Sequence, residues 1–210
     1  MPSSLLSIDV VIPVYNAERT LRTAVDSVLA QAPLNVLWLV DDGSTDGSWA
    51  LMQALAQQHP HQVKALRMPA NAGVAAARNW GLKHSHADLV AFLDADDSYL
   101  PEALAVAQMA MQSAPSMGLV RLGLQPQGFS DAIMQHPQFA HAWRVLQMTV
   151  GGNTVFRRGL LLACGGFPED ALFKKWGGED GALGIALTHA AVVGTVFEKP
   201  FVVHNYHEGV

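Results

Sequence analysis

The sequence has little of several features that mark common classes of protein. Its single cysteine, Cys164, cannot form a disulfide within the chain, which is typical of a reducing compartment. We expect this cysteine to be a small buried side chain. Lysine and arginine number 13 against 18 aspartates and glutamates, which gives a net charge of −5. The basic residues form no block and do not alternate with aromatic ones, which argues against a nucleic-acid partner.

Long apolar runs are also missing. The longest largely apolar stretch of the second half, residues 181–197, is interrupted by Thr188 and His189. It is shorter than the roughly 20 residues that a membrane-spanning helix needs. Met1 to Ser7 lacks the basic and apolar regions of a signal peptide. We therefore expect no transmembrane segment and a cytoplasmic protein, with peripheral contact to the inner face of the membrane left open.

The chain does contain short apolar runs that end in acidic residues. Residues 89–93 lead into Asp94-Ala95-Asp96-Asp97, and residues 36–40 lead into Asp41-Asp42. Carboxylates that are crowded at the end of a buried strand repel one another unless a cation or a charged ligand neutralises them. One alternative is that Asp97 only caps the helix that Pro101 opens. A cap needs one aspartate, so the cluster favours a metal site.

Strand-like runs alternate with helical patterns, which indicates an α/β sheet. Ligands of open α/β sheets bind beyond the carboxyl ends of the strands, so we expect Tyr15, Asp42 and Asp96 to converge on one crevice. The expected strands are 8–14, 36–40, 63–67, 89–93, 117–122, 153–157 and 192–197. The expected helices are 17–31, 47–58, 73–84, 101–113, 138–147, 158–163 and 179–189.

A set of short motifs follows in a fixed order along nearly the whole chain. They are Ile12-Pro13-Val14-Tyr15-Asn16, Val40 to Asp46, Asn71-Ala72-Gly73, Ala77-Arg78-Asn79, Leu93 to Asp97, Gly152-Asn153 with Phe156-Arg157-Arg158, Gly165-Gly166-Phe167, Gly178-Glu179-Asp180, and Lys199-Pro200-Phe201 ahead of His207. Together they resemble the inverting glycosyltransferases of family two. An ordered series of this kind is far more specific than any single motif.

The resemblance implies the GT-A fold, an α/β architecture in which helices flank a central, mostly parallel sheet. It implies a nucleotide-sugar-binding half, residues 1–115, and an acceptor-binding half, residues 116–210, within one compact domain. The segment 114–131 is rich in glycine and proline, so we expect the boundary between the halves there.

The resemblance also implies a metal. It assigns Asp96 as a direct ligand, with Asp94 supporting the metal shell or the donor ribose. Oxygen ligands favour Mg²⁺ or Mn²⁺, and an imidazole from His207 would favour Mn²⁺. Many relatives carry the pattern Y-R-x-H at this C-terminal position, whereas the chain reads His204-Asn205-Tyr206-His207.

The nucleotide side is implied in the same way. Asp42 resembles the aspartate that contacts the base, and UDP is the favoured nucleotide. Tyr15 suits stacking on a base, although a partly buried strand-end tyrosine is the alternative. Arg78 is assigned to donor binding, with a solvated surface charge as its alternative. The remaining donor-binding residues are Pro13 and Glu18.

Inverting transfer needs a base that removes the proton of the acceptor hydroxyl. The resemblance assigns Asp180 to this role and Glu179 to positioning of the acceptor. The alternative is that both acids only stabilise the start of a helix, which is worth roughly 0.5 to 1 kcal/mol.

The sequence thus predicts a metal-dependent inverting glycosyltransferase that uses a nucleotide-diphosphate sugar, with a UDP-sugar favoured. A catalytically idle nucleotide-sugar-binding subunit is the alternative from another class. A sugar nucleotidyltransferase is a further one, but it calls for a basic glycine-rich loop after the first strand, and residues 13–16 are not such a loop. The sugar and the acceptor hydroxyl, saccharide or lipid-linked, are not identified, and we expect acceptor specificity in residues 125–150.

Overall fold

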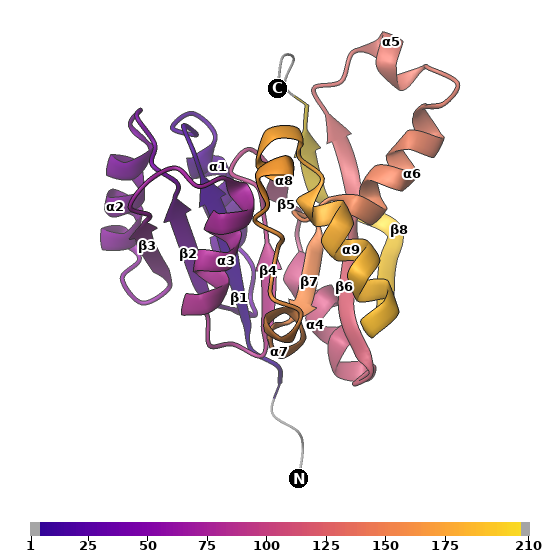
Figure 1. Ribbon diagram of the computed structural model, residues 1–210, viewed down its shortest axis with the longest axis horizontal. Coiled ribbons are helices and arrows are strands. Elements are labelled where there is room, and N and C mark those ends of the chain that lie inside the picture. Colours follow the sequence, from indigo (N-terminus) through magenta and orange to yellow (C-terminus); the bar gives the residue numbers. More distant parts are fainter. Residues whose placement is uncertain (1–4, 207–210) are drawn as a thin grey trace.

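The computed structural model describes residues 5–206, and within that range the strands form one eight-stranded sheet with the order β3-β2-β1-β4-β7-β6-β8-β5 (Figure 1). Four of the seven pairings between described strands are parallel, so the sheet is mixed. The strands are β1 (Ile8–Val14), β2 (Leu34–Asp41), β3 (Val63–Arg67), β4 (Leu89–Phe92), β5 (Ser98–Tyr99), β6 (Met117–Gln127), β7 (Thr154–Arg157) and β8 (Val192–Asn205).

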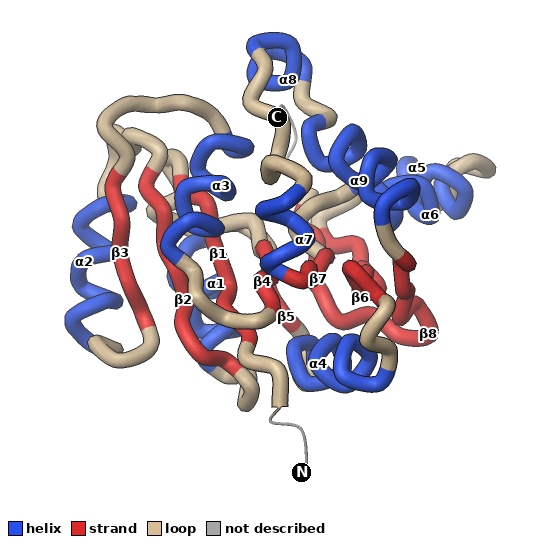
Figure 2. Tube along the Cα trace, turned by 60° about the horizontal axis from the view of Figure 1, so that its bottom comes forward, coloured by secondary structure: helices blue, strands red, loops and turns tan. Residues whose placement is uncertain are grey.

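Helices cover both faces of the sheet (Figure 2). Core residues of α1, α2 and α4 pack with one face, and those of α3, α7 and α9 pack with the other. The helices are α1 (Leu21–Leu29), α2 (Ser48–Gln58), α3 (Val74–His84), α4 (Ala103–Ser113), α5 (Asp131–Met134), α6 (Phe139–Thr149), α7 (Arg158–Ala163), α8 (Ala171–Trp176) and α9 (Glu179–Ala190). The sheet thus separates two hydrophobic layers, as the alternating pattern predicts.

Strand β1 is buried along its whole length and carries residues for both layers. Val10 and Ile12 belong to one layer and Val11 to the other, because successive strand residues point to opposite faces. From β1 the chain adds β2 and β3 on one side and then returns to place β4 on the other. The strand order therefore reverses between β1 and β4, and such a switch point opens a crevice at the carboxyl ends of the strands.

The second half adds the antiparallel part of the sheet. Strand β7 runs antiparallel to both β4 and β6, and β6 runs parallel to the long β8. The glycine- and proline-containing segment 114–131 holds the whole of β6. The division of the chain into a donor half and an acceptor half stays a prediction.

Several element boundaries differ from those expected. The first helix begins at Leu21 and not at residue 17, because the backbone before it is held in a turn in which Ala17 N–H donates to Ser48 Oγ at 2.8 Å. The last strand continues to Asn205 and not to residue 197, since β6 extends to Gln127 and pairs with it there. Local patterns did not predict β5, α5 or α8, which are short.

The structure excludes one alternative that the sequence left open, and it contradicts one expectation. Asp97 does not cap the following helix, whose N-cap is Glu102 at φ +71°. The Asp97 carboxylate instead accepts a hydrogen bond from Asn205 N–H at 2.9 Å, because β8 runs past it. Cys164 is exposed rather than buried, because it follows the end of α7 on the surface.

In the part of the chain that the structure describes, no helix combines the length and the apolar character needed to span a bilayer.

Candidate active site

A cleft of about 1020 Å³ lies at the carboxyl ends of β1, β2 and β4. It brings together residues that follow three different strands, so the predicted convergence of Tyr15, Asp42 and Asp96 is confirmed. The cleft is lined by Pro13, Val14, Tyr15, Asn16, Ala17, Glu18, Arg19, Thr20, Asp42, Asp46, Asn71, Gly73, Val74, Ala77, Asp94, Ala95, Asp96 and Lys174. Among the predicted site residues, Pro13, Glu18 and Asp94 therefore also line it.

Asp42 lies at one side of the cleft, almost fully buried. Its Oδ1 accepts a hydrogen bond from Ala72 N–H at 2.7 Å, and its Oδ2 accepts one from Gly73 N–H at 2.8 Å. The Asn71 side chain in turn donates to the Asp42 carbonyl at 3.0 Å. Gly73 adopts φ +97° immediately before α3, a conformation that favours glycine. Asp42 thus fixes the loop before α3 against the cleft.

Tyr15 and Glu18, which follow β1, also line the cleft. The Tyr15 side chain is 54% exposed, so its ring is available to a ligand in the cleft. Glu18 Oε2 accepts a hydrogen bond from Gly47 N–H at 2.7 Å, which ties the loop after β1 to the start of α2. Asn16 reinforces this link by accepting from Thr45 N–H at 2.8 Å. This part of the cleft wall is therefore held by contacts between two strand-end loops.

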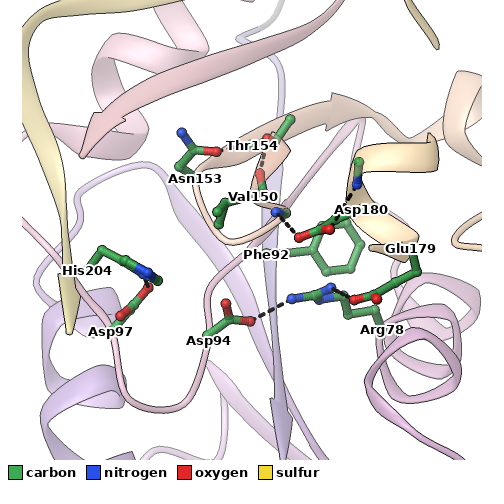
Figure 3. Close-up of polar contacts among 12 residues, drawn as sticks. Arg78, Phe92, Asp94, Asp97, Val150, Asn153, Thr154, Glu179, Asp180 and His204 are labelled. Atoms are coloured by element: carbon green, nitrogen blue, oxygen red, sulfur yellow. Dashed lines mark hydrogen bonds and ion pairs between the residues drawn. The ribbon is translucent and has the colours of Figure 1, made fainter. Parts of the chain in front are cut away.

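Arg78 does not line the cleft, but it contacts Asp94, which does, and Figure 3 shows it between Asp94 and Glu179. Its Nη2 donates to Asp94 Oδ1 at 2.7 Å, and its Nη1 donates to Glu179 Oε1 at 3.0 Å. Its side chain is only 4% exposed, so the predicted surface-charge alternative is wrong. Burial works against the charge, but Asp94, Asp180 and Glu179 together hold the pKa of Arg78 above its ordinary value.

Small residues on α3 explain this placement. Ala75, Ala76 and Ala77 are buried and let the helix pack closely against the sheet. The long Arg78 side chain can therefore reach both Asp94 and Glu179. A donor contact by Arg78 stays a prediction. What the structure shows is that Arg78 joins an acid of the cleft to an acid of α9.

Asp180 follows Glu179 in the first turn of α9 and faces the loop before β7 (Figure 3). Its Oδ2 accepts a hydrogen bond from Gly151 N–H at 2.9 Å, and its Oδ1 accepts one from Gly181 N–H at 2.8 Å. A Cβ at Gly151 would lie 3.3 Å from both Arg78 Nη1 and Asp180 Cβ. A Cβ at Gly152 would lie 3.0 Å from Asp94 Oδ2. The two glycines therefore let the backbone run between these acids.

Sequence reasoning missed Arg121, which contacts the loop before β7. It is buried, and burial lowers its pKa. Its Nη1 donates to the Val150 carbonyl at 3.0 Å and to Thr154 Oγ1 at 3.1 Å. These bonds fix both ends of the loop whose Gly151 N–H contacts Asp180. An isolated arginine inside a predicted strand carries no motif, so only the structure reveals this role.

The third acid of the cluster after β4 contacts the last strand. Asp97 Oδ2 is 2.8 Å from His204 Nδ1. Burial raises the pKa of Asp97 to about 6, and the hydrogen bond with Asp97 raises the pKa of His204. Asn205 Nδ2 also donates to the Asp96 carbonyl at 2.7 Å. The end of β8 is thus held against the aspartate loop, while His207 lies outside the described residues.

The acids of the cleft meet part of what a divalent cation requires. Within residues 5–206, no group of three or more histidine, cysteine, aspartate or glutamate residues is placed to hold a metal ion. Asp94 and Asp96 both line the cleft, and Asp94 uses Oδ1 for Arg78. Carboxylate oxygens are hard ligands that suit Mg²⁺ or Mn²⁺. The two residues fit a cation that would take its remaining ligands from a bound ligand.

Residues 9–161 match the family described as Glycosyl transferase family 2. The chain belongs to this family. Among curated members, an uncharacterized glycosyltransferase of Nostoc sp. is 37% identical over 55% of this chain and 36% of its own length. The polyprenol monophosphomannose synthase of Mycolicibacterium smegmatis is 38% identical over 45% of this chain and 37% of its own length. The matches therefore span little more than a third of these relatives.

Solved structures of other glycosyltransferases share the fold. The mannosyltransferase PcManGT from Pyrobaculum calidifontis, in complex with GDP-Man and Mn²⁺, superimposes with a TM-score of 0.78. The match covers 99% of this chain and 59% of that one at 20% identity. Residues 1–349 of TarS from S. aureus superimpose with a TM-score of 0.76 at 21% identity, over 95% of this chain and 60% of that one. The family 2 chain thus has the predicted GT-A fold.

Proposed function

We propose that this family 2 member is a metal-dependent, inverting glycosyltransferase that uses a nucleotide-diphosphate sugar, with a UDP-sugar favoured. One observation carries the proposal. The cleft that holds Asp42, Asp94 and Asp96 is joined through Arg78 to Glu179, the neighbour of Asp180. A donor site and a candidate base thus share one network.

The donor would lie along the cleft. Tyr15 offers a ring face for the base, and Asp42 lines the same cleft, where it also fixes residues 72 and 73. Solved relatives support this choice of ligand, because TarS was crystallised with UDP and with UDP-GlcNAc. The preference for uridine over guanosine comes from the sequence resemblance.

The diphosphate would lie next to Asp94 and Asp96, which would hold Mn²⁺ or Mg²⁺. When bound, the cation supplies positive charge to the leaving diphosphate. Arg78 restrains Asp94 through its 2.7 Å contact, so this carboxylate keeps one orientation. The sequence resemblance assigns His207 to the same cation.

The acceptor would approach from the side of α9. Its hydroxyl oxygen forms a bond to the anomeric carbon as the bond to the diphosphate oxygen breaks, and the hydroxyl proton passes to Asp180. Gly151 and Gly181 each donate to one oxygen of Asp180, which fixes the direction of the carboxylate. A carboxylate oxygen has two lone pairs, so each oxygen still has room for the acceptor hydroxyl.

The test is a binding and turnover panel. Thermal unfolding is measured with UDP, GDP and their sugars, with and without Mn²⁺, because a ligand at 100 times its dissociation constant adds about 2.7 kcal/mol of stability. We expect stabilisation by UDP that needs the metal, followed by release of UDP from the matching UDP-sugar with inversion at the anomeric carbon.

The same panel separates the alternatives. Donor binding without hydrolysis or transfer, across a broad acceptor screen, would favour the catalytically idle subunit. Release of pyrophosphate from a nucleoside triphosphate and a sugar 1-phosphate would favour a nucleotidyltransferase. A cytoplasmic location with peripheral membrane contact stays a prediction.

A further inference from the structure

The donor cleft receives one side chain from far along the chain. Every lining residue but one belongs to the first 96 residues, and among the described residues the exception is Lys174 of α8. Its Nζ donates to the Asn71 carbonyl at 3.1 Å. Its Cγ would lie 3.5 Å from a Cβ at Gly73, so the aliphatic part of the side chain runs along this glycine. Lys174 therefore enters the cleft from the second half of the chain, beside the loop that Asp42 fixes.

Two consecutive residues of α3 fix the segment that carries Lys174. Asn79 binds Phe167 at the start of this segment, accepting from its N–H and donating to its carbonyl, both at 2.8 Å. Arg78 binds Glu179 at its end. Residues 167–179, which include α8, thus form a strap that is held at both ends by α3. The position of Lys174 follows from these anchors.

The cleft has more acidic than basic lining residues, and this excess of negative charge indicates a function for Lys174. Lining carboxylates come from Glu18, Asp42, Asp46, Asp94 and Asp96, whereas the lining cations are Arg19 and Lys174. Arg78 is committed to Asp94 and Glu179. A nucleoside diphosphate brings two to three further negative charges, which repel these acids unless cations face them. An ammonium group has three donors, and the Asn71 carbonyl takes one.

We propose that Lys174 is a donor-binding residue whose ammonium group contacts a phosphate of the bound nucleoside diphosphate. This inference rests on the proposed function, since it presumes a nucleoside diphosphate in the cleft. It places a phosphate contact on the half of the chain that was predicted to bind the acceptor. The strap thereby links donor binding to α9, which begins with Glu179 and Asp180.

The adjacent Lys175 provides a matched control. It lies on the same exposed helix and carries the same charge, but it does not line the cleft. Its Nζ lies 4.9 Å from the centre of the Trp176 ring. Lys174→Met and Lys175→Met therefore remove equal charge from neighbouring positions, and Lys174→Arg restores the charge at the first of them.

The experiment is calorimetric titration of wild type and the three variants with UDP and with uridine, in Mn²⁺ buffer. We expect Lys174→Met to bind UDP about tenfold more weakly, because a hydrogen bond to a charged group is lost. Its affinity for uridine should be unchanged. Lys175→Met should match wild type for both ligands, and Lys174→Arg should recover most of the UDP affinity.

The proposal is overturned if Lys174→Met binds UDP as wild type does, or if the UDP affinity of both methionine variants falls by the same factor. It is also overturned if uridine loses as much affinity as UDP, because the contact would then not involve phosphate. In these cases wild type still binds UDP and the proposed function stands. If wild type binds no nucleoside diphosphate, the proposed function fails and this inference fails with it.

Discussion

Arg78 of α3 and Glu179 of α9 form an ion pair at 3.0 Å, with side chains that are 4% and 8% exposed. The same guanidinium binds Asp94 in the cleft, so one arginine connects the loop after β4 to the start of α9. The contact with Glu179 is buried, and a buried charge that loses its partner is costly. The relative placement of the donor cleft and the candidate base thus depends on Arg78.

Arg78→Met should therefore destabilise the fold strongly. We expect a loss of about 3–5 kcal/mol, because Glu179 is left buried without its partner. The measurement is urea unfolding followed by circular dichroism. The control is Lys199→Met, which removes an exposed ion pair with Glu102 and should cost no more than about 1 kcal/mol. Equal costs for the two variants would mean that the Arg78 network adds nothing to stability.

Asp96→Ala should abolish Mn²⁺-dependent binding of UDP while leaving the fold intact, because Asp96 is proposed as a direct metal ligand. Calorimetric titration with and without Mn²⁺ measures the effect, and thermal unfolding checks the fold. Asp131→Ala, which removes an acid from the exposed helix α5, serves as the control and should bind as wild type does. Unchanged metal-dependent affinity in the Asp96 variant would exclude it as a ligand.

Asp180→Asn should separate binding from turnover. Donor affinity should stay within a few fold, while transfer falls by roughly 10² to 10⁴, because an amide does not accept the acceptor proton. Transfer rate and donor dissociation constant are measured together, once an acceptor has been found by screening. Asp170→Asn, which changes an exposed acid before α8, should leave both unchanged. Full turnover by Asp180→Asn would move the search for the base to Glu179.

Two adjacent glycines should respond differently to alanine. Gly165 and Gly166 adopt φ +86° and +79°, so alanine strains the backbone at either position. A Cβ at Gly165 would meet no atom within 4 Å, whereas one at Gly166 would collide with Asn79 Oδ1. We expect Gly165→Ala to cost about 1–2 kcal/mol. Gly166→Ala should lower the free energy of unfolding by clearly more in the same denaturant titration. Equal losses would contradict the pair of hydrogen bonds that holds Phe167 against Asn79.

The ionisation of Asp88 should make the free energy of unfolding depend on pH in the acidic range. Its Oδ2 accepts hydrogen bonds from Ser7 N–H at 2.9 Å and Ser7 Oγ at 2.8 Å, and these bonds lower the pKa of Asp88 in the folded state. The stabilisation is therefore present above the unfolded pKa, about 3.9, and is lost as pH falls through the lower folded pKa.

Wild type should accordingly be more stable than Asp88→Ala at neutral pH, and the difference should shrink towards pH 2. Thermal unfolding across this range measures it. A difference that stays constant with pH would assign the effect to packing.

The sequence by itself determined the arrangement of the first half and the acids of the cleft. Apolar runs that alternate with helical patterns specify a parallel sheet through local periodicity. Asp42, Asp94 and Asp96 follow their strands directly along the chain. Once the strands are parallel, their carboxyl ends share one edge, so the residues there must meet. Pattern and order were therefore sufficient for this part.

Only the tertiary structure decided which groups meet across the molecule. Nothing near Lys174 in the chain indicates that it reaches Asn71, and nothing near Arg121 indicates that it fixes the loop contacting Asp180. The extension of β8 to Asn205 likewise depends on β6 beside it. These contacts join residues far apart in sequence, and they form only when helices and strands pack together. Local periodicity does not indicate which distant residues will be partners, so these contacts can be identified only in the folded structure.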